Sequence, residues 1–157
     1  MEVREYQIVH DKFLHPVLRC NHKYKWDGNS LLTYEEIYDM MCSSFHMDIL
    51  NEEYTYVIAL NIQSELLGVF NISHGEIGKS TVNIQVLFTF LILTGAYKFI
   101  LLHNHPSGTL EISLEDINLT NSISRVCNFI DIKMEEHMII SSKGYSLAKA
   151  KEKYPFE

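Results

Sequence analysis

The pattern of apolar and polar positions divides the chain into a short N-terminal part and a longer, more regular part. Residues 3–9 alternate weakly and predict a strand or an extended arm. Residues 15–30 contain many turn-forming residues, so we expect an irregular segment there. We therefore predict an N-terminal arm over residues 1–30 and a main domain over residues 31–157.

Three helices are predicted in the main domain. A Thr-x-x-Glu capping box precedes the first one. The second is a long apolar run that ends at Gly95, and we expect it to be covered on most sides. Ser113 is a natural cap for the third. The predicted helices cover residues 34–46, 82–94 and 113–129.

Strands are predicted where aromatic and β-branched residues gather between turn signals. The first two lie on either side of a short polar turn and predict a hairpin, and the third is expected at the centre of the sheet. Strands and helices alternate irregularly along the chain, which predicts an α/β fold with a mixed β-sheet flanked by helices. The predicted strands cover residues 54–61, 66–73, 97–102, 133–141 and 145–147.

Composition and charge exclude several classes of protein. The 157 residues are 46% hydrophobic and 21% charged, which is typical of one globular domain. The net charge of −7, with no run of Lys or Arg, argues against a nucleic-acid partner for this chain alone. The most hydrophobic run, residues 86–93, is too short to span a bilayer, and the first twenty residues do not resemble a signal peptide. Three cysteines without a CxxC pair lead us to expect a reducing, cytoplasmic location.

The most informative segment is HNHP at residues 103–106. Side chains alternate along a strand, so His103 and His105 are expected on the same face at the strand end. Seven residues separate His105 from Ser113, and the helix that Ser113 caps places Asp116 in its first turn. Two histidines and one carboxylate, with a fourth position open, are typical of catalytic zinc. The sequence therefore predicts one Zn²⁺ ion bound by these two histidines and Asp116.

Other interpretations of these residues were weighed. A serine followed three residues later by an aspartate is also an ordinary helix cap. The adjacent letters H-N-H are not the scattered motif of the nucleases that share that name. A zinc deaminase needs a P-C-x-x-C segment, and the chain has no CxxC. His137 has no partner evident from the sequence and is interpreted as structural.

The stretch HNHPSG followed by S-x-x-D resembles the JAMM metalloprotease motif in the form found in bacterial RadC-like proteins. The resemblance spans about residues 50–148 and includes the segments EHMIIS and GYSL. It implies the three-layer architecture of JAMM and cytidine-deaminase-like domains. It also implies a glutamate at the start of an upstream strand, which falls on Glu53, with Glu52 as the less favoured neighbour.

The resemblance implies a zinc-dependent metallopeptidase or isopeptidase. The resemblance also implies that Glu53 acts as the base, that Ser113 donates a hydrogen bond to the oxyanion, and that the substrate is a peptide or an isopeptide. Two alternatives stay open: a DNA-repair-associated accessory protein, as the RadC name suggests, and a non-catalytic interaction module. The acidic net charge counts against a DNA-associated protein. The presence of every residue of the motif counts against a non-catalytic module.

The chain also departs from the family pattern. The Pro and the Arg-Glu pair that the family often has before its central helix are missing from residues 82–88. The loop at residues 109–112, Thr-Leu-Glu-Ile, is more apolar than the usual Asp-Pro-Thr-Pro. The helix-hairpin-helix module of longer RadC proteins is not expected in a chain of this length. Contacts that depend on those features are therefore not implied for this chain.

Overall fold

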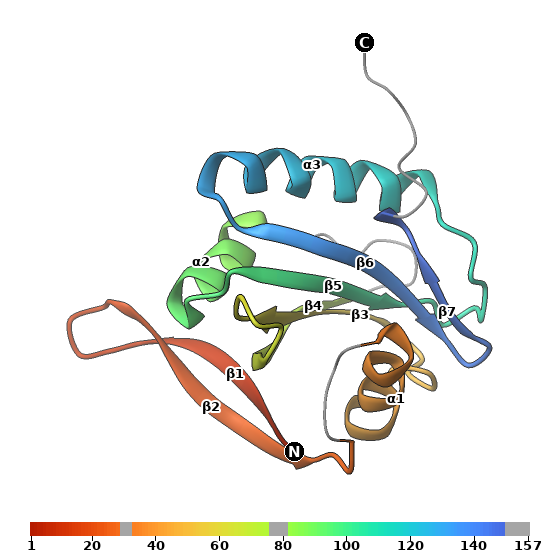
Figure 1. The fold of residues 1–157 in the computed structure, drawn as a ribbon, viewed down its shortest axis with the longest axis horizontal. Coiled ribbons are helices and arrows are strands. Elements are labelled where there is room, and N and C mark those ends of the chain that lie inside the picture. Colours follow the sequence, from red (N-terminus) through yellow and green to blue (C-terminus); the bar gives the residue numbers. More distant parts are fainter. Residues whose placement is uncertain (29–32, 76–81, 150–157) are drawn as a thin grey trace.

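The computed structural model describes residues 1–28, 33–75 and 82–149, and these form three layers (Figure 1). The middle layer is a mixed seven-stranded sheet with the order β2-β1-β4-β3-β5-β6-β7. The β1/β4 and β5/β6 pairs are parallel, and the other neighbours are antiparallel. The α/β fold with a mixed sheet is therefore confirmed. The strands are β1 (Glu2–His10), β2 (Pro16–Lys25), β3 (Glu53–Leu60), β4 (Leu66–Gly75), β5 (Lys98–Asn104), β6 (Lys133–Ser141) and β7 (Gly144–Leu147).

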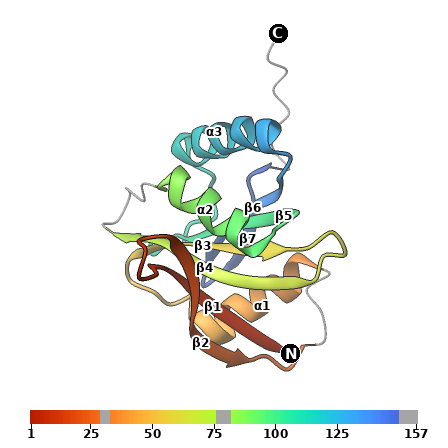
Figure 2. The same ribbon diagram turned by 90° about the vertical axis from the view of Figure 1, so that its left-hand side faces the viewer.

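Helices cover both faces of the sheet (Figure 2). Helix α1 (Tyr34–Phe45) lies on one face and begins with the predicted capping box. Helices α2 (Ile84–Thr94) and α3 (Leu114–Ile130) lie on the other face. A left-handed residue, Gly95 with φ 67°, ends α2 as expected of a glycine C-cap. The predicted helices, and the strands predicted in the main domain, agree with the structure to within two residues at each end.

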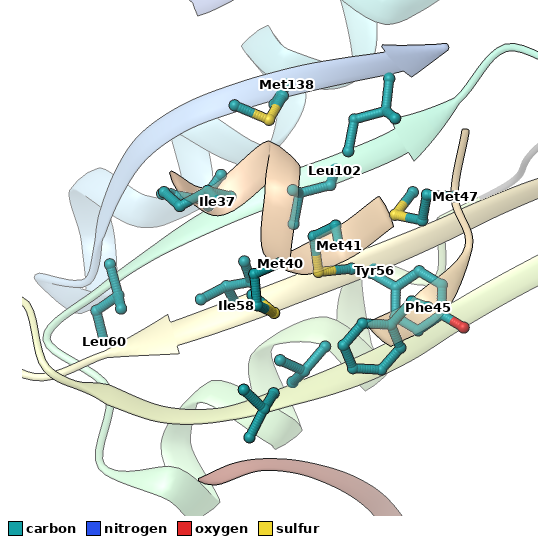
Figure 3. Close-up of a cluster of buried hydrophobic side chains, with 14 residues drawn as sticks. Ile37, Met40, Met41, Phe45, Met47, Tyr56, Ile58, Leu60, Leu102 and Met138 are labelled. Carbon is teal, nitrogen blue, oxygen red and sulfur yellow. The ribbon is translucent and has the colours of Figure 1, made fainter. Parts of the chain in front are cut away.

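Apolar side chains alternate along the central strands and fill the space on both sides of the sheet. Ile58 and Leu102 pack with Met40 of α1 in one buried cluster (Figure 3). Their strand neighbours Val57 and Leu101 belong to a second buried cluster, under α2 and α3. Burying side chains of this size stabilises the fold by roughly 1.5–3 kcal/mol each. The same alternation directs His103, near the end of β5, toward α3, where the candidate site lies.

The N-terminal segment differs from the prediction. Residues 16–25 form strand β2, which pairs with β1 along its whole length, so the irregular segment predicted at residues 15–30 is wrong over this part. Most side chains of β2 are exposed, so the strand lacks the alternation by which a half-buried strand is recognised. Its pairing with β1 forms it instead. The proposed boundary at residue 30 lies outside the described residues and stays a prediction.

Helix α2 is less covered than its sequence suggests. Leu87, Phe88, Phe90 and Leu91 are buried, but Ile92 is 64% exposed. The expectation that this helix is covered on most sides is therefore wrong for its last turn. No helix in the described part of the chain is long and apolar enough to cross a membrane.

Candidate metal centre

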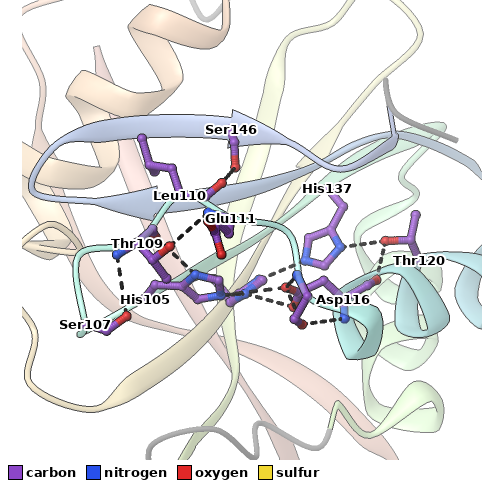
Figure 4. Close-up of polar contacts among 11 residues, drawn as sticks. His105, Ser107, Thr109, Leu110, Glu111, Asp116, Thr120, His137 and Ser146 are labelled. Carbon is purple, nitrogen blue, oxygen red and sulfur yellow. Dashed lines mark hydrogen bonds and ion pairs between the residues drawn. The ribbon is translucent and has the colours of Figure 1, made fainter.

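The predicted ligands come together where β5 ends against the first turn of α3 (Figure 4). His103 is the penultimate residue of β5, and His105 follows that strand directly. Asp116 lies in the first turn of α3. The side chains of His103 and Asp116 are buried, and His105 is half-buried. The site is therefore a largely buried cluster of polar side chains between the sheet and one helix.

The distances within this group suit a zinc ion. Nε2 of His103 lies 2.9 Å from Nε2 of His105 and 3.1 Å from Oδ1 of Asp116. Nε2 of His105 lies 3.7 Å from Oδ2 of Asp116. Ligand atoms about 2.0–2.1 Å from a tetrahedral zinc ion are roughly 3.3 Å apart, and the three observed separations lie on either side of this value. The donor types and their separations therefore fit a single zinc ion.

His105 is held by the loop that follows β5. Its backbone N–H donates to the carbonyl of Ile140 at 2.8 Å, and its carbonyl accepts from the N–H of Gly108 at 2.9 Å. Gly108 has a φ of 76°, which favours glycine in this turn. The ring atom Nδ1 lies 3.2 Å from the carbonyl of Thr109. Because a carbonyl only accepts, Nδ1 carries the hydrogen, and the lone pair of Nε2 points at the site.

The charge state of His105 also suits a metal ligand. Burial lowers the pKa of His105, and the neighbouring imidazole of His103, which would repel a second positive charge, lowers it further. The carboxylates of Asp116 and Glu53 act in the opposite direction but do not reverse the shift. The imidazole is therefore neutral near pH 7, which is the form that binds metal ions.

Asp116 is oriented by the capping box of α3. Its Oδ2 accepts from the backbone N–H of Ser113 at 2.8 Å and from the Ser113 hydroxyl at 2.7 Å. Oδ1 is then left facing His103. Burial by itself would raise the pKa of Asp116, but its contacts with His103 and Ser113 hold that pKa well below its usual range. Asp116 is therefore a negatively charged group with one oxygen free for a cation.

The loop between β5 and α3 is anchored at a second point. The hydroxyl of Ser146 in β7 donates to the carbonyl of Leu110 at 2.9 Å (Figure 4). The neighbouring Glu111 N–H donates to the hydroxyl oxygen of Thr109 at 3.1 Å. These bonds fix the segment that contacts the ring of His105.

Two buried residues that the sequence did not connect with the site lie behind His103. Nε2 of His137 lies 2.9 Å from Nδ1 of His103, and Nδ1 of His137 lies 2.7 Å from Oγ1 of Thr120. Burial lowers the pKa of His137 to about 3. One ligand atom from each of His103, Asp116 and His137 lies within 4.8 Å of the others, so this buried group could hold a metal ion.

A signal for His137 is present in the sequence. Strand β6 runs parallel to β5, and His137 pairs with Leu101, which lies two residues before His103 and on the same face. This signal places His137 at the site only once β6 is known to be the neighbour of β5. Residues of β6 contact the site only because β6 is the neighbour of β5 in the sheet.

Glu53 begins β3, next to the end of β5. The pairing of Thr55 with His103 brings the first residues of β3 alongside the end of β5, where the candidate histidine ligands lie. Glu53 is half-buried, and its charge acts on His105, whereas Glu52 is exposed. Glu53 therefore lies at the end of β3 nearest the candidate ligands, whereas Glu52 faces solvent, and its role as the base stays a prediction.

Comparisons with known proteins identify the family of this chain. The sequence model of the RadC-like JAB domain matches residues 31–153. A UPF0758 protein of Caldanaerobacter subterraneus subsp. tengcongensis is 36% identical over 112 residues, which cover 71% of this chain and 48% of that protein. A UPF0758 protein of Clostridium tetani is 35% identical over 103 residues, which cover 66% of this chain and 45% of that protein.

The chain spans about half the length of these curated relatives. The family match, in contrast, covers most of the chain and includes β3, β5, β6 and α3, the elements that carry the candidate site. This chain therefore belongs to the RadC-like JAB domain family.

Proposed function

We propose that this chain is a zinc-dependent hydrolase of the JAMM type, with His103, His105 and Asp116 as the ligands of one ion. The observation that carries the proposal is the convergence of two ring nitrogens and one carboxylate: Nε2 of His103 lies within 3.1 Å of both partners, and Nε2 of His105 lies 3.7 Å from the carboxylate of Asp116. The other ring nitrogen of His105, Nδ1, is held by the carbonyl of Thr109. The other carboxylate oxygen of Asp116, Oδ2, is held by the hydroxyl of Ser113. Three protein ligands leave one position open, as in catalytic zinc sites.

When bound, zinc supplies a Lewis acid that brings the pKa of a water ligand to about 7. Glu53 is proposed to accept the proton of the attacking water and to pass it to the leaving amine. Its half-buried place beside His105 supports this role. In the proposed reaction, the Ser113 hydroxyl exchanges its bond with Asp116 for one to the oxyanion, while the Ser113 backbone N–H keeps Asp116 in place.

The substrate class follows from the JAMM resemblance: an amide bond in a peptide or an isopeptide. A cytoplasmic location is proposed because Cys20, Cys42 and Cys127 are all free thiols. We do not propose nucleic acid as a partner for this chain, because it has a net charge of −7.

The decisive experiment is a panel of peptide and isopeptide substrates, assayed after chelation and after reloading with one equivalent of zinc. Cleavage that appears only after reloading would support the proposal. A zinc-loaded, folded protein that cleaves no member of the panel would favour a non-catalytic module of the same fold.

A further inference from the structure

We infer that His137 and Thr120 are positioning residues that keep a hydrogen on Nδ1 of His103 and so reserve its Nε2 for the metal. They form a chain of hydrogen bonds that starts at the backbone of α3 and ends on His103. The importance of this hydrogen-bond chain, and a bare Nε2 on His103 beside Nε2 of His105 and Oδ1 of Asp116, rest on the proposed zinc site. The hydrogens on Nδ1 of His137 and His103 do not, because contacts within the protein set them.

The chain begins at Thr120. Its Oγ1 lies 2.7 Å from the carbonyl oxygen of Asp116, one turn earlier in α3. Two oxygen atoms this close need a hydrogen between them, and a carbonyl has none to give. The Thr120 hydroxyl therefore donates its single hydrogen to Asp116. At every other contact, this hydroxyl oxygen must accept.

His137 is the next member. Its Nδ1 lies 2.7 Å from Oγ1 of Thr120, so the hydrogen in this contact belongs to Nδ1. The side chain is fully buried, and its two ring nitrogens contact a hydroxyl and an imidazole rather than a carboxylate. A charged imidazolium is strongly disfavoured in such a place. His137 is therefore neutral, and its Nε2 carries a lone pair.

His103 completes the chain. Nε2 of His137 can only accept, so the hydrogen in its 2.9 Å contact belongs to Nδ1 of His103. Nε2 of His103 is then the atom that faces His105 and Asp116. If all the hydrogen bonds ran in the opposite direction, the hydrogen of His103 would lie on Nε2. The 2.7 Å contact between Oγ1 of Thr120 and the carbonyl oxygen of Asp116 would then have no hydrogen. The geometry therefore selects the direction that prepares His103 for a metal ion.

His137 belongs to a cluster with His103 and Asp116 that could hold a metal ion, so it could be a ligand or a partner of a ligand. The hydrogen-bond direction distinguishes these two roles. The lone pair on Nε2 of His137 accepts from His103, and the same lone pair cannot also bind a metal ion. His137 therefore holds a ligand in place rather than serving as one. Outer partners of this kind fix the orientation and the tautomer of metal-binding histidines.

The direction of the chain is tested by nitrogen NMR of the histidine rings in chelator-treated protein, in mildly alkaline buffer. We expect His103 and His137 each to carry a hydrogen on Nδ1. In Thr120→Val, His137 loses the acceptor of its Nδ1 hydrogen, and its ring signals are expected to change. A hydrogen on Nε2 of His137 in the wild-type protein would overturn the inference.

The effect on the site is tested by zinc affinity, measured by competition with a chromogenic chelator. Thr120→Val removes the hydroxyl and keeps the shape, and we expect it to weaken zinc binding by roughly 10–100-fold. Thr120→Ser keeps the hydroxyl and is the matched control, expected to stay within a few-fold of the wild type. Unchanged affinity in Thr120→Val, or equal weakening in both variants, would overturn the inference.

The two tests also separate this inference from the proposed function. A wild-type protein that binds no zinc would contradict the metal site, whereas the ring nitrogens of His103 and His137 would still report the direction of the chain. A protein that binds zinc but hydrolyses nothing would contradict the proposed reaction and leave both tests valid.

Discussion

The side-chain oxygen of Asn104 accepts a 2.7 Å hydrogen bond from the backbone N–H of Tyr54. The side-chain nitrogen of Asn104 donates to the carbonyl of Glu52 at 2.9 Å, so one amide holds the backbone on both sides of Glu53. Asn104 is buried, and alternation along β5 turns its side chain away from the face that carries His103. The residue between the two candidate histidine ligands therefore holds the backbone around the proposed base.

This contact predicts the behaviour of Asn104→Ala. Without the amide, the start of β3 is no longer fixed, and we expect turnover to fall roughly 10–100-fold because the base is misplaced. Zinc content should stay at one equivalent, and the free energy of unfolding should fall by about 1–3 kcal/mol. Asn118→Ala, an exposed asparagine of α3, is the control. Full turnover in Asn104→Ala would show that this contact does not orient Glu53.

Glu53→Gln tests the role of the proposed base directly. The amide cannot accept a proton, so we expect turnover to fall by about 10²–10⁴-fold while zinc content is unchanged. Glu52→Gln, at the exposed neighbouring position, is expected to retain turnover. The rates are compared on the substrate found in the panel, with zinc measured in the same samples. Loss of zinc from Glu53→Gln would instead make Glu53 a ligand.

Asp116→Ala is expected to lower zinc affinity by more than the 10–100-fold that is typical of losing an outer partner, because a charged ligand is removed. Glu115→Ala, the exposed neighbour in the same helical turn, should bind zinc like the wild type. Chelator competition gives the affinities, and thermal unfolding of the metal-free forms shows whether α3 still forms. Equal affinity in the two variants would place the metal elsewhere.

The metal-free protein is expected to lose stability in acid. Burial lowers the pKa of His137 from 6.5 to about 3, so between these values the folded state binds fewer protons than the unfolded state. The free energy of unfolding therefore falls as the pH is lowered from 6.5, by up to about 1.4 kcal/mol per pH unit from this residue. The lowered pKa of His105 acts in the same direction.

This pH dependence is measured by urea unfolding in the presence of chelator, from pH 6.5 down to about pH 4, above the ordinary Asp value of 3.8. His137→Leu is expected to have a shallower dependence than the wild type. His15→Gln, an exposed histidine, is the control and should keep the full slope. A slope that His137→Leu does not change would assign the effect to other groups.

Binding of this chain to duplex DNA is expected to be weak, with a dissociation constant in the micromolar range or above at physiological salt. The net charge is −7, and neutralising phosphates requires several positioned Lys or Arg side chains. A titration at two salt concentrations checks this expectation. Nanomolar affinity at physiological salt would instead favour the DNA-associated alternative.

The sequence by itself determined much of the local structure. Capping boxes, a glycine stop and runs of β-branched residues predicted α1, α2, α3 and the strands of the main domain, because these signals act over a few neighbouring residues. The spacing of His103, His105 and Asp116 was likewise sufficient to predict a metal site. Strand β2 was not predicted, because its mostly exposed side chains show no alternation of apolar and polar residues. Backbone pairing with β1 stabilises this strand instead.

Only the tertiary structure decided what surrounds the site. His137 of β6 reaches His103 because β6 pairs with β5, and Thr120 of α3 reaches His137 because α3 packs against β6. Asn104 acts on β3 through a pairing between strands that are far apart in the sequence. The direction of the hydrogen bonds depends on these contacts, because the carbonyl of Asp116 can only accept from Thr120. The ligand types follow from the sequence, but their orientation follows from the fold.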